Sequence, residues 1–168
     1  MKNRLYNYLL IFAAFNLIIS CHNTSNCAIS EKTIQLKYYK LKHPDNGIIT
    51  PCKFKLKACD DKNIFNYHFD NKNDSVILNK RNDSLLYNNE IARFAEIRNF
   101  IYNGKNITVK KYVSADLDNL FVNDQLGIVL QISAGKLSDT YIVFDITNNG
   151  ELYKQIIRDK QFMKVLYK

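Results

Sequence analysis

Residues 52–58, CKFKLKA, alternate strictly between lysine and less polar side chains. Alternation with a period of two is typical of a half-buried β-strand, because every second side chain lies on the same face. The earlier segment 33–41, TIQLKYYKL, alternates in the same way, and HPDNG at 43–47 favours a turn between the two. We therefore expect an antiparallel hairpin with the apolar side chains of both strands on one face.

The register of this hairpin also bears on three cysteines. Along one strand, Cys52 and Cys59 would lie about 23 Å apart at ~3.3 Å per residue and on opposite faces, so they cannot bond to each other. Aligning the two apolar faces brings Cys59 opposite residue 31, close to Cys27, and brings Cys52 opposite Tyr38 in the core. The register favours a Cys27–Cys59 disulfide, with Cys52 as a buried thiol.

Further strands are expected downstream of the hairpin. The polar tip DNKNDS (70–75) separates two apolar segments and predicts a second hairpin with a longer loop. TNNG (147–150) predicts a tight turn. The other segments predicted as strands are 64–69, 76–78, 107–113, 126–133, 140–146 and 151–157, with an edge strand over 161–168.

One segment, about 88–103, has the spacing of a helix. Its apolar residues Ile91, Phe94, Ile97 and Ile101 recur every three to four positions, and a glycine follows where a helix end favours one. The expected fold is α+β, a mainly antiparallel sheet with this one helix. An all-β sandwich or a small barrel is the alternative.

The N-terminus has the build of an export signal. Lys2 and Arg4 precede the apolar run LLIFAAFNLII (9–19), which is shorter than the roughly 20 residues of a membrane span. The run ends in IISC (18–21), which resembles the lipobox of bacterial lipoproteins. The resemblance implies that the Cys21 thiol is joined to diacylglycerol and that the chain is cut before this residue. A simple secreted protein is the alternative.

The lipobox resemblance also implies where the protein lies. His22, in place of an aspartate after the cysteine, favours the outer membrane of a Gram-negative bacterium, with the domain facing the periplasm. The inner membrane and the cell surface are the alternatives. The expected organisation is a signal peptide at 1–20, a lipidated tether at 21–31 and one globular domain at 32–168. An exported chain meets an oxidising compartment, which supports a disulfide.

The charge of the chain suggests one candidate binding surface. The formal net charge is +8, and removal of the two basic residues of the signal lowers it by two. In the expected register Lys37, Lys53, Lys55 and Lys57 share one sheet face. They form a candidate anion-binding face for a glycan phosphate, lipid A or an acidic partner, although a merely solvated face is the alternative. Nucleic acid is not expected, because the aromatic residues fall on the other face.

No local motif supports catalysis, a metal or a cofactor. None of the three histidines, His22, His43 and His68, has a nucleophile in a recognisable motif. The spacing of Cys52, Cys59 and the histidines lacks the short cysteine pair of structural zinc sites. Residues 70–75 lack the ligand positions of a calcium loop. We expect no catalytic residue, no metal and no cofactor.

Two tripeptides suggest a modification. DSV at 74–76 and DSL at 83–85 resemble the acceptor of general O-glycosylation in Bacteroides-like bacteria, which would place glycans on Ser75 and Ser84. Chance or helix capping explains so short a pattern as well. Both serines are expected in polar turns, which an acceptor requires.

The mature domain itself resembles no family. We expect a non-catalytic binding or interaction module of the cell envelope, anchored to the membrane by its lipid, with an envelope protein as its partner. An envelope hydrolase is one alternative. A carrier for lipid or haem is another, since 11 tyrosines and 10 phenylalanines would suit an apolar cavity as well as a core.

Overall fold

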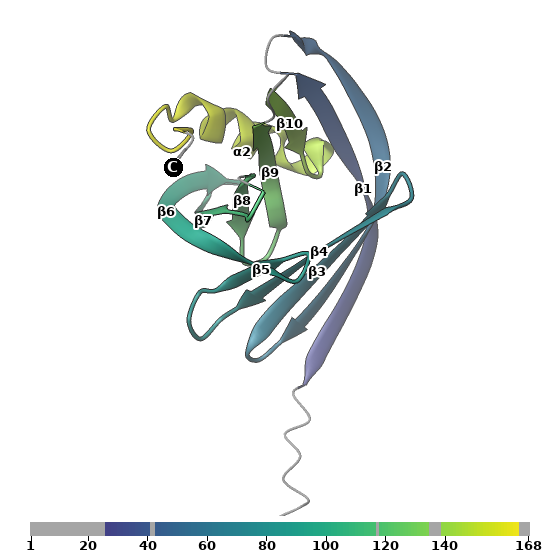
Figure 1. The fold of residues 1–168 in the computed structure, drawn as a ribbon, viewed down its shortest axis with the longest axis vertical. Helices are drawn as coiled ribbons and strands as arrows, with labels where there is room; N and C mark the ends of the chain where they lie inside the picture. Colours follow the sequence, from purple (N-terminus) through teal and green to yellow (C-terminus); the bar gives the residue numbers. More distant parts are fainter. Residues whose placement is uncertain (1–25, 41–42, 117, 135–138, 165–168) are drawn as a thin grey trace, which may run out of the picture.

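The computed structural model describes residues 26–40, 43–116, 118–134 and 139–164, which form a closed antiparallel barrel with one helix, α2 (Ile146–Arg158; Figure 1). Each strand is bonded to its neighbours in the sequence, and β1 closes on β10. The mainly antiparallel sheet is confirmed, closed as in the small-barrel alternative. The strands are β1 (Cys27–Lys40), β2 (His43–Cys59), β3 (Lys62–Phe69), β4 (Lys72–Asn79), β5 (Leu85–Tyr87), β6 (Glu90–Tyr102), β7 (Lys105–Val113), β8 (Asn119–Asn123), β9 (Gly127–Ala134) and β10 (Asp139–Val143).

The expected first hairpin is formed by β1 and β2. Ile34 lies opposite Cys52 and Leu36 lies opposite Thr50, so the buried side chains of both strands share the interior face. The pairing continues to the end of β1 and the start of β2.

The turn expected at 43–47 is wrong, because these residues belong to β2. Pairing with the neighbouring strand outweighs their local preference for a turn.

Three hairpins turn through two residues whose φ angles are both positive. Such turns match the twist of the flanking strands and favour asparagine, aspartate and glycine, which tolerate the left-handed region. The loop expected over 70–75 is shorter than predicted, since β4 already begins at Lys72. The turn residues are Asp70 and Asn71, Asn88 and Asn89, and Asn103 and Gly104.

The helix expected at 88–103 is wrong, because this segment is the strand β6. A register shift after Phe94 inserts one residue into the strand, so Phe94, Ile97 and Ile101 share a face despite their helical spacing. Ile91 lies on the opposite face, and all four side chains are exposed. A bulge thus reproduces the spacing on which helix prediction depends.

The helix α2 lies where the sequence predicted a turn at 147–150 and a strand at 151–157. Its buried residues Asn149, Leu152 and Ile156 recur at helical spacing. Two asparagines and a glycine favour a turn locally, but burial of the apolar side chains against the barrel overrides that preference. In the described part of the chain, no helix combines the length and apolar character needed to cross a bilayer.

The strands β8 and β9 are buried on both faces. Leu120 and Val122 join the interior core, whereas Phe121 lies in a second core shared with α2. Figure 1 shows α2 lying over this side of the barrel. Phe162 also belongs to the second core. Residues 161–163 form a turn, so the edge strand expected at 161–168 does not start there.

Aromatic side chains fill the barrel interior. Tyr67 is 1% exposed, and its ring centroid lies 4.9 Å from that of Phe144 in an edge-on contact. The Tyr67 hydroxyl accepts a 2.7 Å hydrogen bond from the N–H of Ile128, and the Tyr112 hydroxyl donates one of 3.0 Å to the carbonyl of Asp83. These buried hydroxyls therefore keep hydrogen-bond partners, as buried polar groups require.

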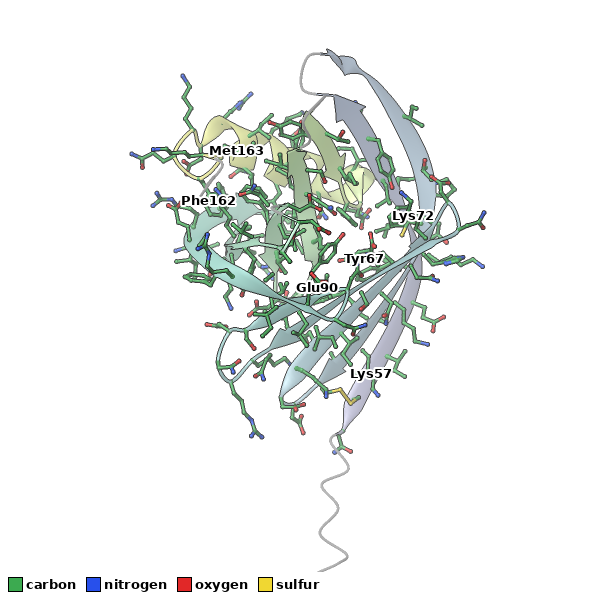
Figure 2. The ribbon with its side chains drawn as sticks, viewed as in Figure 1. Lys57, Tyr67, Lys72, Glu90, Phe162 and Met163 are labelled. Atoms are coloured by element: carbon green, nitrogen blue, oxygen red, sulfur yellow. A yellow bond between two sulfur atoms is a disulfide. The ribbon has the colours of Figure 1, made fainter. Side chains whose placement is uncertain are left out.

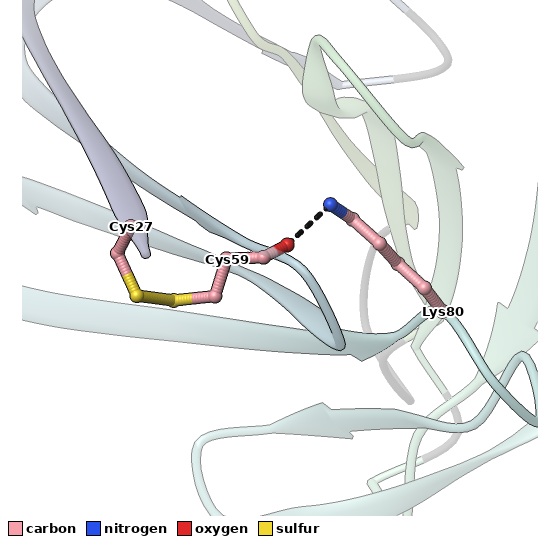
Figure 3. The surroundings of a disulfide bond; sticks show 3 residues. All are labelled: Cys27, Cys59 and Lys80. Carbon is pink, nitrogen blue, oxygen red and sulfur yellow. Dashed lines mark hydrogen bonds between the residues drawn. A yellow bond between two sulfur atoms is a disulfide. The ribbon is translucent and has the colours of Figure 1, made fainter. Parts of the chain in front are cut away.

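A disulfide joins Cys27 to Cys59 at the end of the first hairpin (Figure 3). It is the pair expected from the sequence, although Cys59 lies directly opposite Cys27 and not opposite residue 31. Lys80 donates a 2.5 Å hydrogen bond to the carbonyl of Cys59, which ties the hairpin end to the segment after β4. Cys52 is a buried free thiol.

The barrel begins earlier than the domain boundary expected at residue 32. Because β1 starts at Cys27, the last five residues of the expected tether at 21–31 are paired with β2. The expected signal peptide at 1–20 and its lipidation residue Cys21 lie outside the described residues.

Replacing both Cys27 and Cys59 by serine is expected to lower the free energy of unfolding by about 4 kcal/mol, since the disulfide closes a loop with a sequence separation of 32. Urea titration followed by circular dichroism measures the change. Reductant should have a similar effect on the unaltered protein and none on the double variant. A double variant as stable as the oxidised parent would contradict the prediction.

The protein is expected to lose stability above pH 10. Burial raises the pKa of Tyr153 to about 12 and also raises the pKa of Tyr38, Tyr67, Tyr87 and Tyr112. A raised folded-state pKa contributes stability that is present below the unfolded value of ~10 and is lost as pH rises, by up to ~1.4 kcal/mol per pH unit for each group.

Absorbance of tyrosinate and circular dichroism, followed together through an alkaline titration, check this expectation. The buried tyrosines should ionise only as the barrel unfolds. The variant Tyr153→Phe should show a shallower loss of stability with pH. Ionisation of all tyrosines near pH 10 in a protein that stays folded would contradict the prediction.

Candidate functional site: a polar groove across four strands

A groove of about 640 Å³ crosses the first four strands. It is lined by three consecutive residues from each strand, namely 31–33 in β1, 53–55 in β2, 66–68 in β3 and 73–75 in β4. With neighbouring strands ~4.8 Å apart, the groove extends about 14 Å across the sheet. Four triplets in adjacent strands make this one continuous feature of the sheet surface.

The strand register decides which side chains reach the groove. Phe54 lies opposite Lys32 and Tyr67, and Tyr67 lies opposite Asp74, so these middle residues form one row across the strands. Phe54 and Tyr67 are buried in the core, and Figure 2 shows Tyr67 inside the barrel. Lys32 bonds on the same inner side to the buried carboxylate of Asp145, at 2.8 Å. The middle row therefore contributes backbone to the groove floor, and its neighbours project outward.

One wall of the groove carries an ion pair. Lys55 Nζ lies 2.6 Å from a carboxylate oxygen of Glu31 on the adjacent strand, and both side chains are about half exposed. Exposed pairs of this kind contribute little stability, so an incoming anion can displace the carboxylate at small cost. Asn66 and Ser75 continue the same wall across β3 and β4.

The other wall carries a lysine and an imidazole. Lys53 lies opposite Thr33 on one side and His68 on the other. His68 Nδ1 lies 2.5 Å from Asn73 Oδ1, so Nδ1 donates the hydrogen to this amide oxygen. Among the described residues, no carboxylate lies within ion-pair distance of the Lys53 ammonium. The groove therefore combines positive charge with amide, hydroxyl and imidazole groups.

The structure brings together two of the four lysines expected to form an anion-binding face. Lys53 and Lys55 line the groove. Lys57 projects from the same strand but lies beyond the groove toward the disulfide (Figure 2). Lys37 lies opposite Ile49, four residues along β2 from Lys53. The four residues share the outward side, but they do not form one site.

Sequence reasoning missed the contribution of β3 and β4 to the groove. The signal was present in the alternation of 65–69, where Asn66 and His68 separate three buried aromatic residues. This alternation identifies Asn66 and His68 as outward polar residues. Only the register of β3 against β2 shows that they lie beside Lys55 and Lys53. Asn73 and Ser75 were assigned to a loop and therefore were not expected to belong to a binding surface with the lysines.

The two serines proposed as glycan acceptors lie in different surroundings. Ser75 belongs to β4, not to a turn as expected, and its backbone N–H and C=O are both bonded to Asn88. Ser84 is exposed in the segment between β4 and β5, where its N–H is bonded to the side chain of Asn82. Of the two, only Ser84 has the accessible non-strand backbone that an acceptor requires.

The thiol and the imidazole of this region lie on opposite sides of the sheet. Cys52 is fully buried, and burial raises the pKa of its thiol to about 11, so it is a poor nucleophile near neutral pH. His68 projects outward into the groove. Within the described ranges, no three His, Cys, Asp or Glu side chains are placed to hold a metal ion.

The comparisons with known proteins identify no relative. No family model matches the chain, and it matches neither a curated protein nor a solved structure. The function must therefore be argued from the groove and the sequence alone.

Proposed function

We propose that the protein is a lipid-anchored envelope protein whose barrel binds an acidic glycan chain in the groove across β1–β4. The observation that carries the proposal is the juxtaposition of Lys53, Lys55 and His68 along a polar groove on four adjacent strands. Lys53 lies directly opposite His68, and Lys55 lies two residues from Lys53 on the same strand. A non-catalytic binding module is the function that this arrangement supports best.

The chemistry of the walls favours a charged carbohydrate. The two ammonium groups suit phosphate or carboxylate groups, and the amides of Asn66 and Asn73 can both donate to and accept from sugar hydroxyls. All the aromatic residues of the lining, Phe54 and Tyr67, face the core. A ligand that relies on stacking is therefore less suitable than one that relies on hydrogen bonds and charge.

The rest of the barrel supports binding at its surface. Tyr67 and Phe144 pack in the interior that a lipid or haem carrier would keep open. A hydrolase would require a nucleophile and a base within hydrogen-bond reach. Cys52 and His68 point to opposite sides of the sheet, and the hydrogen-bond partner of His68 is the side chain of Asn73.

The proposed lipid anchor would hold the groove close to the membrane. From a lipidated Cys21 to Cys27, the first residue of β1, six residue steps reach at most about 21 Å. The disulfide end of the barrel would then be held near the bilayer, with Glu31 and the groove only four residues farther along β1. Acidic glycans of the envelope are within reach of such a site. We propose the periplasmic side of the outer membrane as its location.

Replacing both Lys53 and Lys55 by glutamine is expected to weaken binding of a carboxylated oligosaccharide, such as an oligogalacturonate, by about tenfold or more. Titration calorimetry at low and high salt measures the affinity, which should fall with salt in the parent. The matched control is Lys37→Gln with Lys57→Gln, which removes the same charge outside the groove. Equal weakening by both pairs, or equal binding of an uncharged galactose oligosaccharide, would contradict the proposal.

The anchor is tested separately by mass spectrometry of the protein isolated from its own membranes. We expect a chain that begins at Cys21 and carries acyl groups on this residue. The variant Cys21→Ala should be neither acylated nor cut before residue 21. An unmodified Cys21 thiol in the parent would overturn the anchor without affecting the groove.

A further inference from the structure

The strand β6 has an open edge. β5 covers only Glu90–Ala92, and beyond these residues β6 is paired along one side with β7. Among the described residues, no strand pairs with the other side of β6 from Arg93 onward. The unpaired edge is therefore a segment of extended backbone that can accept another strand.

The hairpin geometry fixes which backbone groups face this edge. The two-residue turn at 103–104 makes Tyr102 and Lys105 a hydrogen-bonded pair, so the odd-numbered residues before it point away from β7. Gln155 of α2 shows this directly. Its side chain accepts a 3.2 Å bond from the N–H of Ile101 and donates a 2.7 Å bond to its carbonyl. This amide takes the place of a strand at one end of the edge.

The side chains beside the edge are apolar on one face and charged on the other. Phe94, Ile97 and Ile101 share one face and are 50%, 49% and 52% exposed. On the other face, Arg98 and Glu96 form an ion pair of 2.5 Å. Exposed apolar side chains beside unpaired backbone are a hallmark of an interaction surface.

We propose that the occupant of this edge is a second copy of the chain, whose β6 pairs antiparallel with the first and places Ile97 on the twofold axis. The N–H and C=O of Ile97 then bond to those of the other copy's Ile97, and their side chains pack together. In this register, Glu96 lies opposite the other copy's Arg98, and Arg98 lies opposite its Glu96. The edge is thus complementary in charge to itself, which argues for a second copy over an unrelated strand.

The proposed contact between the two β6 strands is short, because other features of the same chain limit it at both ends. Gln155 occupies the backbone of Ile101, and the bulge after Phe94 interrupts the other end. Pairing is therefore confined to the few residues centred on Ile97, which predicts a reversible dimer and limits growth into longer sheets. The groove on β1–β4 lies on other strands and takes no part in this contact.

The first test is cross-linking of the full chain carrying Ile97→Cys. In an antiparallel hydrogen-bonded pair the two Cα atoms lie ~5.5 Å apart, which a disulfide can span. Mild oxidation should yield a covalent dimer through residue 97. The matched control is Ile64→Cys, at a partly exposed isoleucine of β3 that is paired on both sides, with Lys57 of β2 and with Ile77 of β4. No dimer at residue 97, or as much at residue 64, would overturn the proposal.

The second test uses charge in sedimentation equilibrium. Ile97→Lys should weaken self-association at least about tenfold, because it puts like charges together on the axis, whereas Ile64→Lys should leave it unchanged. Glu96→Lys alone should also weaken it, and adding Arg98→Glu should restore it. A parent that is monomeric throughout a concentration series, or a dimer that persists with Lys at 97, would overturn the inference. Circular dichroism confirms that each variant folds.

Discussion

The register between β1 and β2 is the constraint on which the rest of the structure depends. These two strands are the longest of the described residues, and between them they contact β10 on one side and β3 on the other. A slip of β2 by one residue against β1 would turn Phe54 outward and Lys53 and Lys55 inward, because strand side chains alternate. It would also separate Cys27 from Cys59. Core, disulfide and groove all require one pairing.

Closure of the barrel gives its two halves different surroundings. The first strands have one face in the core and one in solvent, which leaves room for an outward groove. The later strands are covered by α2, so that even Lys111 is buried there. Its ammonium donates to the carbonyls of Phe162 and Lys164, and burial lowers its pKa. This lysine ties the C-terminal segment to β7, and the groove lies on the outward face of the first four strands.

Prediction of the fold succeeded where one face met water. The alternation in 33–41 and 52–58 reflects such strands, and the asparagine-rich turns can also be recognised locally. Prediction failed at β6 and α2. In β6 a bulge displaced the alternation, and in α2 the local preference of 147–150 for a turn yielded to the burial of Leu152 and its neighbours. Both failures come from contacts that local sequence does not contain.

By itself, the sequence determined the two faces of the first hairpin, since the alternation of each strand depends on neighbours along the chain, and it narrowed the disulfide to Cys27 and Cys59. Only the tertiary structure decided that the lysine row continues through His68 on β3, and that the sheet closes into a barrel. The physical reason is distance along the chain. Strands interact through hydrogen bonds and side-chain contacts between residues far apart in sequence, and neither periodicity nor composition specifies which strands become neighbours.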